Sequence, residues 1–166
     1  MTKGTAAARI GLTIVAAVLL FTLYPLFFRA RPGGYLLVSD DRTGRERLRL
    51  SLSPGEEFFI TFVHSVNNTP ITDVFDVTPA GLVRLRRTVY YDFGAGVPFD
   101  LNPGESFSYA EDGAMIISGI DREVPRFVLF VGTVSDHTLT VGGRTFSLRE
   151  TCGRNARVRI HWVPSK

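Results

Sequence analysis

The chain has 166 residues, of which 45% are hydrophobic and 21% are charged, and this composition predicts one turn-rich globular domain plus an appendage rather than a disordered chain. Four of the 19 basic residues lie at or before Arg31, whereas all 16 acidic residues lie at or beyond Asp40. The net charge of +3 therefore comes from the N-terminal region, and the nearly neutral remainder argues against a nucleic-acid partner. The single cysteine, Cys152, excludes an intramolecular disulfide.

An apolar segment near the N-terminus predicts a membrane anchor. Residues 10–28 form a run of 19 residues without a charge, and a helix of that length covers about 28 Å, close to the hydrocarbon thickness of a bilayer. A buried soluble helix is disfavoured because the run is apolar on all sides and is bracketed by Arg9 and Arg29. A cleavable signal peptide is disfavoured because no small-x-small site follows the run. We therefore expect a single-pass, uncleaved signal anchor.

The anchor divides the chain into four predicted parts. Residues 1–9 are a short tail, residues 10–28 contact the bilayer, residues 29–34 are a linker, and residues 35–166 form the folded domain. The free amino terminus and the lack of acidic residues before the anchor favour a cytoplasmic N-terminus. We therefore expect a protein of the cytoplasmic membrane whose C-terminal domain is extracytoplasmic.

The domain is predicted to be all-β. Short runs rich in β-branched and aromatic residues alternate with Gly, Pro, Asn and Asp turns, and about ten strands at this spacing favour an antiparallel sandwich or barrel without a soluble helix. In the strand expected at 82–91, alternation places two arginines on one face and three apolar residues on the other: Arg84 and Arg86 against Val83, Leu85 and Val89. Between 92 and 105 no period survives, which predicts a long structured loop of a kind that is often functional.

The densest group of chemically capable side chains lies in a predicted β-hairpin at residues 58–77. Two apolar runs flank a polar turn, and a histidine-serine pair stands where the first run meets that turn. The hairpin carries six polar side chains of interest: His64, Ser65, Asn67, Asn68, Asp73 and Asp76. This stretch is therefore the first place to look for a site.

His64 has the widest range of possible chemistry in the hairpin. It cannot form a catalytic pair with Ser65, because neighbouring residues on a strand point to opposite faces. Imidazole and carboxylate together suit zinc or another divalent ion, so His64 and Asp73 form a possible metal site, to which Asp76 or Glu56 could add a ligand. A histidine at a strand end also commonly hydrogen-bonds backbone or an acid, so a structural role for His64 stays open.

Two motifs carry a resemblance to a known family. They are the segment His64-Ser65-Val66 followed by Thr69-Pro70, and the segment Phe93-Gly94-Ala95-Gly96-Val97-Pro98. With them the chain resembles small uncharacterised membrane-anchored proteins, a domain of unknown function, whose genes often lie beside those of TAXI-type TRAP transporters. Members of that family typically carry an acidic residue where this chain has Asn67, and Asp73 is the expected acidic counterpart here.

The hairpin and the glycine-rich loop together define a candidate recognition or ligand site. We expect the two segments to meet in space, and the candidate residues are His64, Ser65, Asn67, Asp73, Phe93, Gly94, Gly96 and Pro98.

The resemblance implies an association with a sodium-coupled uptake system for organic solutes. We therefore expect a non-catalytic membrane-anchored accessory protein, without a cofactor, whose possible partners are the TRAP transporter membrane subunit or its binding protein. Two alternatives stay open: an extracytoplasmic metal- or small-ligand-binding module, and a hydrolase-like enzyme with His64 as general base.

Overall fold

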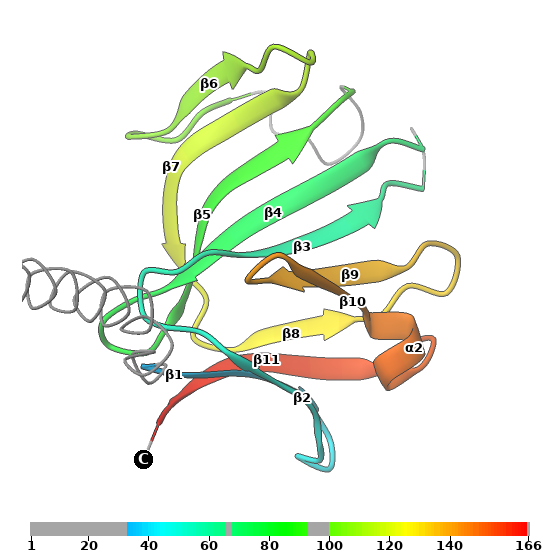
Figure 1. Ribbon diagram of the computed structural model, residues 1–166. Coiled ribbons are helices and arrows are strands. Elements are labelled where there is room, and N and C mark those ends of the chain that lie inside the picture. Colours follow the sequence, from blue (N-terminus) through cyan, green and yellow to red (C-terminus); the bar gives the residue numbers. More distant parts are fainter. Residues whose placement is uncertain (1–32, 66–67, 93–99, 166) are drawn as a thin grey trace, which may run out of the picture. The chain divides into compact units, whose positions relative to one another are not determined.

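The computed structural model describes residues 33–65, 68–92 and 100–165, which form a sandwich of two antiparallel sheets (Figure 1). One sheet has four strands in the order β2-β1-β11-β8, and the other has seven in the order β10-β9-β3-β4-β5-β7-β6. The strands of the four-stranded sheet are β1 (Gly34–Asp40), β2 (Glu46–Ser51), β8 (Phe127–Phe130) and β11 (Arg157–Pro164). The strands of the seven-stranded sheet are β3 (Phe58–Val63), β4 (Pro70–Val77), β5 (Val83–Tyr90), β6 (Ser106–Tyr109), β7 (Met115–Glu123), β9 (His137–Val141) and β10 (Arg144–Ser147).

This architecture confirms the predicted all-β class and selects the sandwich over the barrel. The described residues contain eleven strands where about ten are expected from the sequence. They also contain one short helix that the sequence does not predict, α2 (Leu148–Cys152), which begins where the hydroxyl of Ser147 accepts a hydrogen bond from the backbone N–H of Glu150 at 3.0 Å. Five residues are too few to show a helical period, so only the capping serine marks this helix in the sequence.

The predicted membrane anchor at residues 10–28 lies outside the described residues, as do the tail and residues 29–32 of the linker. Within the described ranges, no helix combines the length and the apolar character needed to cross a bilayer.

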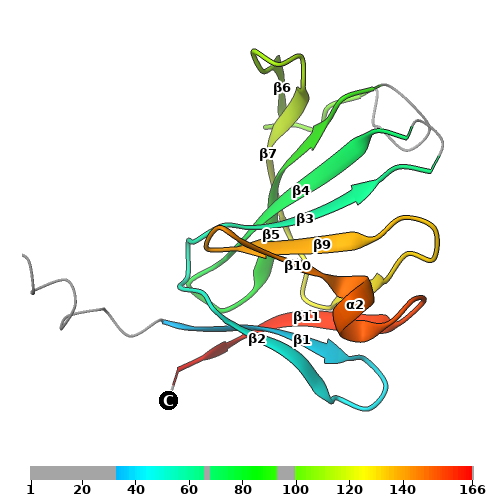
Figure 2. The ribbon, with the colours of Figure 1, turned by 45° about the vertical axis from the view of Figure 1, so that its right-hand side comes forward.

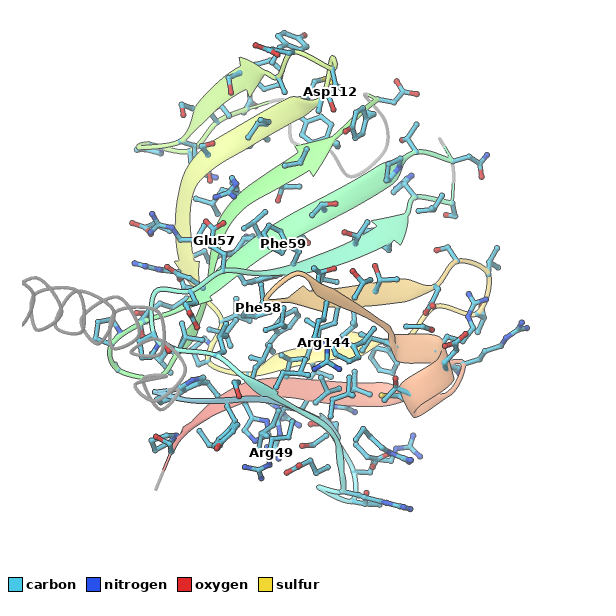
Figure 3. The ribbon with its side chains drawn as sticks, viewed as in Figure 1. Arg49, Glu57, Phe58, Phe59, Asp112 and Arg144 are labelled. Atoms are coloured by element: carbon cyan, nitrogen blue, oxygen red, sulfur yellow. The ribbon has the colours of Figure 1, made fainter. Side chains whose placement is uncertain are left out.

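Aromatic stacking joins the two sheets in the core. The rings of Phe58 on β3 and Phe75 on β4 stack with centroids 5.3 Å apart, and Phe75 contacts Phe127 on β8 of the opposite sheet at 4.8 Å. Phe58 is completely buried between the sheets (Figure 3). Burial of a side chain of this size contributes about 1.5–3 kcal/mol to folding, so this stack is a central element of the sandwich.

The first and last strands are held together by a tryptophan. β1 pairs with β11 from Gly34 opposite Pro164, and the indole N–H of Trp162 donates a hydrogen bond to the backbone oxygen of Leu52 at 2.9 Å. A Cβ atom at Gly34 would collide with the Trp162 ring, so this position requires glycine. The indole ring thus links the end of β11 to the start of β1 and to Leu52, just after β2, in the middle of the four-stranded sheet.

Candidate functional site

The inner face of the seven-stranded sheet extends beyond the four-stranded sheet. The far ends of β4 and β5, together with β6, rise away from the four-stranded sheet in both views (Figure 1, Figure 2). A cleft of about 760 Å³ lies on this part of the face. Six of its described lining residues are apolar or aromatic: Phe62, Ile71, Leu85, Tyr90, Ile117 and Ile120. The other six are polar: His64, Asp73, Thr88, Asn102, Glu105 and Arg122.

Strand register explains why these side chains meet. In an antiparallel sheet, residues directly opposite one another project from the same face. One row across the sheet consists of Phe62, Ile71 and Tyr90, and its members come from β3, β4 and β5. The neighbouring row places Asp73 opposite Thr88, which in turn lies opposite Ile117 on β7. The cleft floor therefore combines an apolar row with a row that contains an acid and a hydroxyl.

Asp73 is the partly buried acid of the cleft. The hydroxyl of Thr88 donates a hydrogen bond to Oδ1 of Asp73 at 2.7 Å, while no described residue donates to Oδ2. Burial raises the pKa of the Asp73 carboxyl above its ordinary value, against the opposing effects of the Thr88 hydrogen bond and the positive charge of Arg122. Oδ2 of Asp73 can therefore accept a further hydrogen bond from a ligand.

Arg122 reaches the cleft because β7 is irregular. Gly119 and Asp121 both have positive φ angles, 74° and 49°, and the pairing of β5 with β7 shifts between Leu85 and Arg87. After the shift, Arg122 stands opposite Leu85, a residue of the inner face. Irregularities of this kind re-aim side chains, and here one brings the exposed Arg122 to the lining of the cleft.

The same irregularity overturns part of the predicted pattern of β5. Alternation predicts that Val89 shares a face with Val83 and Leu85, but the register places Val89 opposite Thr72, on the other side of the sheet. Thr88 moves to the inner face in its place. The prediction is wrong for Val89 because one extra residue in the strand reverses the side chains that follow it.

Hydrogen bonds in two polar turns hold strand ends of the seven-stranded sheet, and the first turn, with Asn102 and Glu105, also lines the cleft. Glu105 accepts hydrogen bonds from the side chain and the backbone N–H of Asn102 at 2.9 and 2.8 Å, and these bonds, with the charge of Arg122, lower the pKa of Glu105. The hydroxyl of Tyr91, just after β5, donates to Asp112 at 2.8 Å in the turn between β6 and β7 (Figure 3). These contacts fix the ends of the strands that carry the cleft.

The predicted site residues have different outcomes. His64, just after β3, and Asp73 on β4 both line the cleft. Ser65 is exposed in the turn after β3 and is not among the lining residues. The remaining candidates, Asn67, Phe93, Gly94, Gly96 and Pro98, lie outside the described residues, so their meeting with the hairpin stays a prediction.

The two further residues considered as metal ligands beside His64 and Asp73 are engaged in other contacts. Asp76 is held by Arg84 through two hydrogen bonds of 2.9 and 2.7 Å on the other face of β4, and Glu56 accepts a hydrogen bond from the backbone of Ser53 in a turn. Across the parts of the chain that the structure describes, no group of three or more His, Cys, Asp or Glu residues is placed to hold a metal ion. A metal held by His64 and Asp73 therefore stays a prediction, with two protein ligands.

Comparison with known proteins gives the family. Residues 58–148, more than half of the chain, match the family described as domain of unknown function DUF1850. The chain belongs to this family. It matches no curated protein and no solved structure. The matched segment begins at the first residue of β3 and includes the entire seven-stranded sheet and β8, so all the described residues that line the cleft lie within the DUF1850 segment.

Proposed function

We propose that this DUF1850 protein is a non-catalytic accessory of a TAXI-type TRAP transporter and that it acts by binding a small organic ligand in its cleft. The cleft carries the binding half of the proposal, and the family resemblance carries the transporter half. In that arrangement the domain would be held outside the cytoplasm by the anchor at residues 10–28.

Several features of the cleft support ligand binding. Its volume of about 760 Å³ lies within the range of ordinary small-molecule sites. Half of its described lining residues are apolar or aromatic, and three of the polar ones, Asp73, Thr88 and Arg122, converge on it from β4, β5 and β7. These three groups project from paired strands rather than from a loop. Paired strands are rigid, so they hold binding side chains in a defined geometry more accurately than a loop does. This combination is typical of recognition sites for amphipathic small molecules.

The ligand-binding half is tested by thermal unfolding of the full chain in mild detergent with a library of small organic solutes. We expect at least one chemical class to raise the melting temperature, because a ligand that binds only the folded state stabilises it. The variant Ile117→Trp should abolish the shift by filling the cleft, whereas Val134→Trp, at an exposed position that does not line the cleft, should leave it unchanged. A shift that survives Ile117→Trp would place the ligand elsewhere.

The transporter half is tested by copurification of a tagged copy with the TRAP membrane subunit in mild detergent. A single apolar span could pack against a helical transporter bundle through close contacts. Repeated failure to copurify, together with normal solute uptake in a deletion strain, would contradict the proposal.

The membrane topology is tested by protease protection in spheroplasts. We expect a C-terminal tag to be digested before lysis, because the domain would lie outside the cytoplasm. Resistance of the tag until lysis would reverse the proposed orientation.

The hydrolase-like alternative rests on the position of His64 in the cleft. It requires turnover of a bound ligand with a pH dependence that is lost in His64→Ala. Recovery of every bound ligand unchanged after prolonged incubation would favour the non-catalytic role.

A further inference from the structure

We propose that the ligand of this cleft is an amphipathic carboxylic acid that carries a second, hydrogen-bond-donating group: Arg122 binds the carboxylate and Asp73 accepts from the donor. This inference rests on the binding role proposed above and adds the chemical class of the ligand. It follows from the placement of one cation and one acid on the same inner face.

Arg122 supplies the anion-binding group. Among the described residues, its guanidinium has no hydrogen-bond or ion-pair partner, although it lies within electrostatic reach of both Asp73 and Glu105. Its fork of N–H donors matches the two oxygens of a carboxylate, and such paired hydrogen bonds are among the strongest in proteins. The neighbouring arginines on β5 differ, because Arg84 binds Asp76 and Arg87 binds Glu57. Arg122 is thus the arginine whose donors remain available to a ligand in the cleft.

Asp73 supplies the acceptor. Its Oδ1 atom is occupied by the Thr88 hydroxyl, and its Oδ2 atom is without a donor among the described residues. A hydroxyl or ammonium group on the ligand would satisfy this oxygen. The acid also disfavours a ligand with a carboxylate alone, because such a ligand brings a second negative charge near Asp73 and leaves Oδ2 without a donor.

The apolar side chains of the cleft predict a nonpolar group on the ligand. Phe62, Ile71 and Tyr90 form one wall, and Ile117 and Ile120 of β7 contribute to the other side of the lining. An aliphatic or aromatic group of the ligand would bury itself against these side chains. Sugars and inorganic anions lack such a group, so they are disfavoured.

The experiment uses the full chain in mild detergent and four probes that share a phenyl group. Phenylalanine and phenyllactic acid carry both a carboxylate and a donor, phenylpropionic acid carries the carboxylate alone, and phenethylamine carries the donor alone. Isothermal titration calorimetry should rank the two bifunctional acids as the tightest ligands. Comparison of phenylalanine with phenyllactic acid then identifies the donor as an ammonium or a hydroxyl group.

Variants assign the contacts. Arg122→Gln should weaken binding of all three acids by roughly 10- to 100-fold, the effect of losing charge-assisted hydrogen bonds. Asp73→Asn should reduce the preference for the bifunctional acids over phenylpropionic acid. Arg154→Gln, at an exposed position that does not line the cleft, is the control for loss of positive charge and should leave affinity unchanged. Thermal unfolding of each variant confirms that it is folded.

The outcomes separate this inference from the proposed function. If phenethylamine or uncharged solutes bind, if Ile117→Trp abolishes their binding, and if Arg122→Gln has no effect, the cleft is a ligand site but the carboxylate assignment is wrong. If none of the acids binds at concentrations up to about 10 mM, the assignment is also overturned. If no solute of any class binds the cleft, the proposed function itself fails.

Discussion

The two halves of the inner face of the seven-stranded sheet share strands and alternation but have different roles. In one half, Phe58, Ile60 and Phe75 are buried beneath the four-stranded sheet. In the other half, Phe62 and Asp73 continue β3 and β4 beyond that sheet and line the cleft. The change from Phe75 to Asp73 takes place within two positions of the same strand.

This difference shows that one inward-facing pattern can make both a core and a site. Close packing against a second sheet excludes unpaired polar groups from the covered half. The uncovered half is free of that constraint and contains an acid, a hydroxyl and a guanidinium among its apolar side chains. The core of the covered half holds the strands in register, so the polar groups of the uncovered half are also held rigidly.

The largest expected effect compares a phenylalanine from each half. Phe58→Ala should lower the free energy of unfolding by about 3–5 kcal/mol, because it removes a buried ring and leaves a cavity in the core. Phe62 is partly exposed and stacks on His137 at 5.1 Å, so Phe62→Ala should lower it by only about 1–2 kcal/mol. Denaturant titration of both variants measures the difference. Equal losses would show that the two halves are packed alike.

The next effect compares the two acids of β4, which lie on opposite faces. Asp76 is buried and bound by both ends of the Arg84 guanidinium, so Asp76→Asn should lower the free energy of unfolding by about 1.5–3 kcal/mol. Asp73→Asn is the matched substitution three residues earlier, and it should raise the free energy of unfolding instead. Denaturant titration at neutral pH would contradict the comparison if both variants lost stability.

The smallest effect is the pH dependence that Asp73 contributes. Burial raises the pKa of Asp73 in the folded state, so the Asp73 carboxyl keeps its proton to a higher pH in the folded state than in the unfolded state. Its contribution to stability is therefore complete below the ordinary pKa of 3.8 and is lost as the pH rises through the folded pKa. Asp73→Asn should be more stable than the parent above that range and should converge with it in acid. Melting temperatures of both proteins across the acid range measure this, and parallel curves would contradict it.

Much of the fold can be predicted from the sequence because its strands follow local rules. Alternating apolar residues and turn signals predict the all-β class, and the hairpin at 58–77 is found as β3 and β4. Two residues of that hairpin, His64 and Asp73, line one cleft, and the pairing of β3 with β4 puts Asp73 opposite Ile60 on the inner face.

The rest of the site could not be predicted because it depends on irregular pairing. Thr88 and Arg122 take their places through register shifts between β4, β5 and β7, and such a shift has no period of its own in the sequence. Gly119 is the one local signal near Arg122, since a glycine within a strand often marks a bulge. Two residues of the predicted long loop, Asn102 and Glu105, do line the cleft.

Trp162 gives the domain a built-in spectroscopic reporter. It is the only tryptophan in the chain, and its indole packs on β1 at Gly34 and is not among the residues that line the cleft. Its fluorescence therefore follows the four-stranded sheet without direct interference from an occupied cleft. A ligand that leaves the emission spectrum unchanged while shifting the unfolding transition monitored at Trp162 would show that occupancy of the cleft on the seven-stranded sheet stabilises the four-stranded sheet as well.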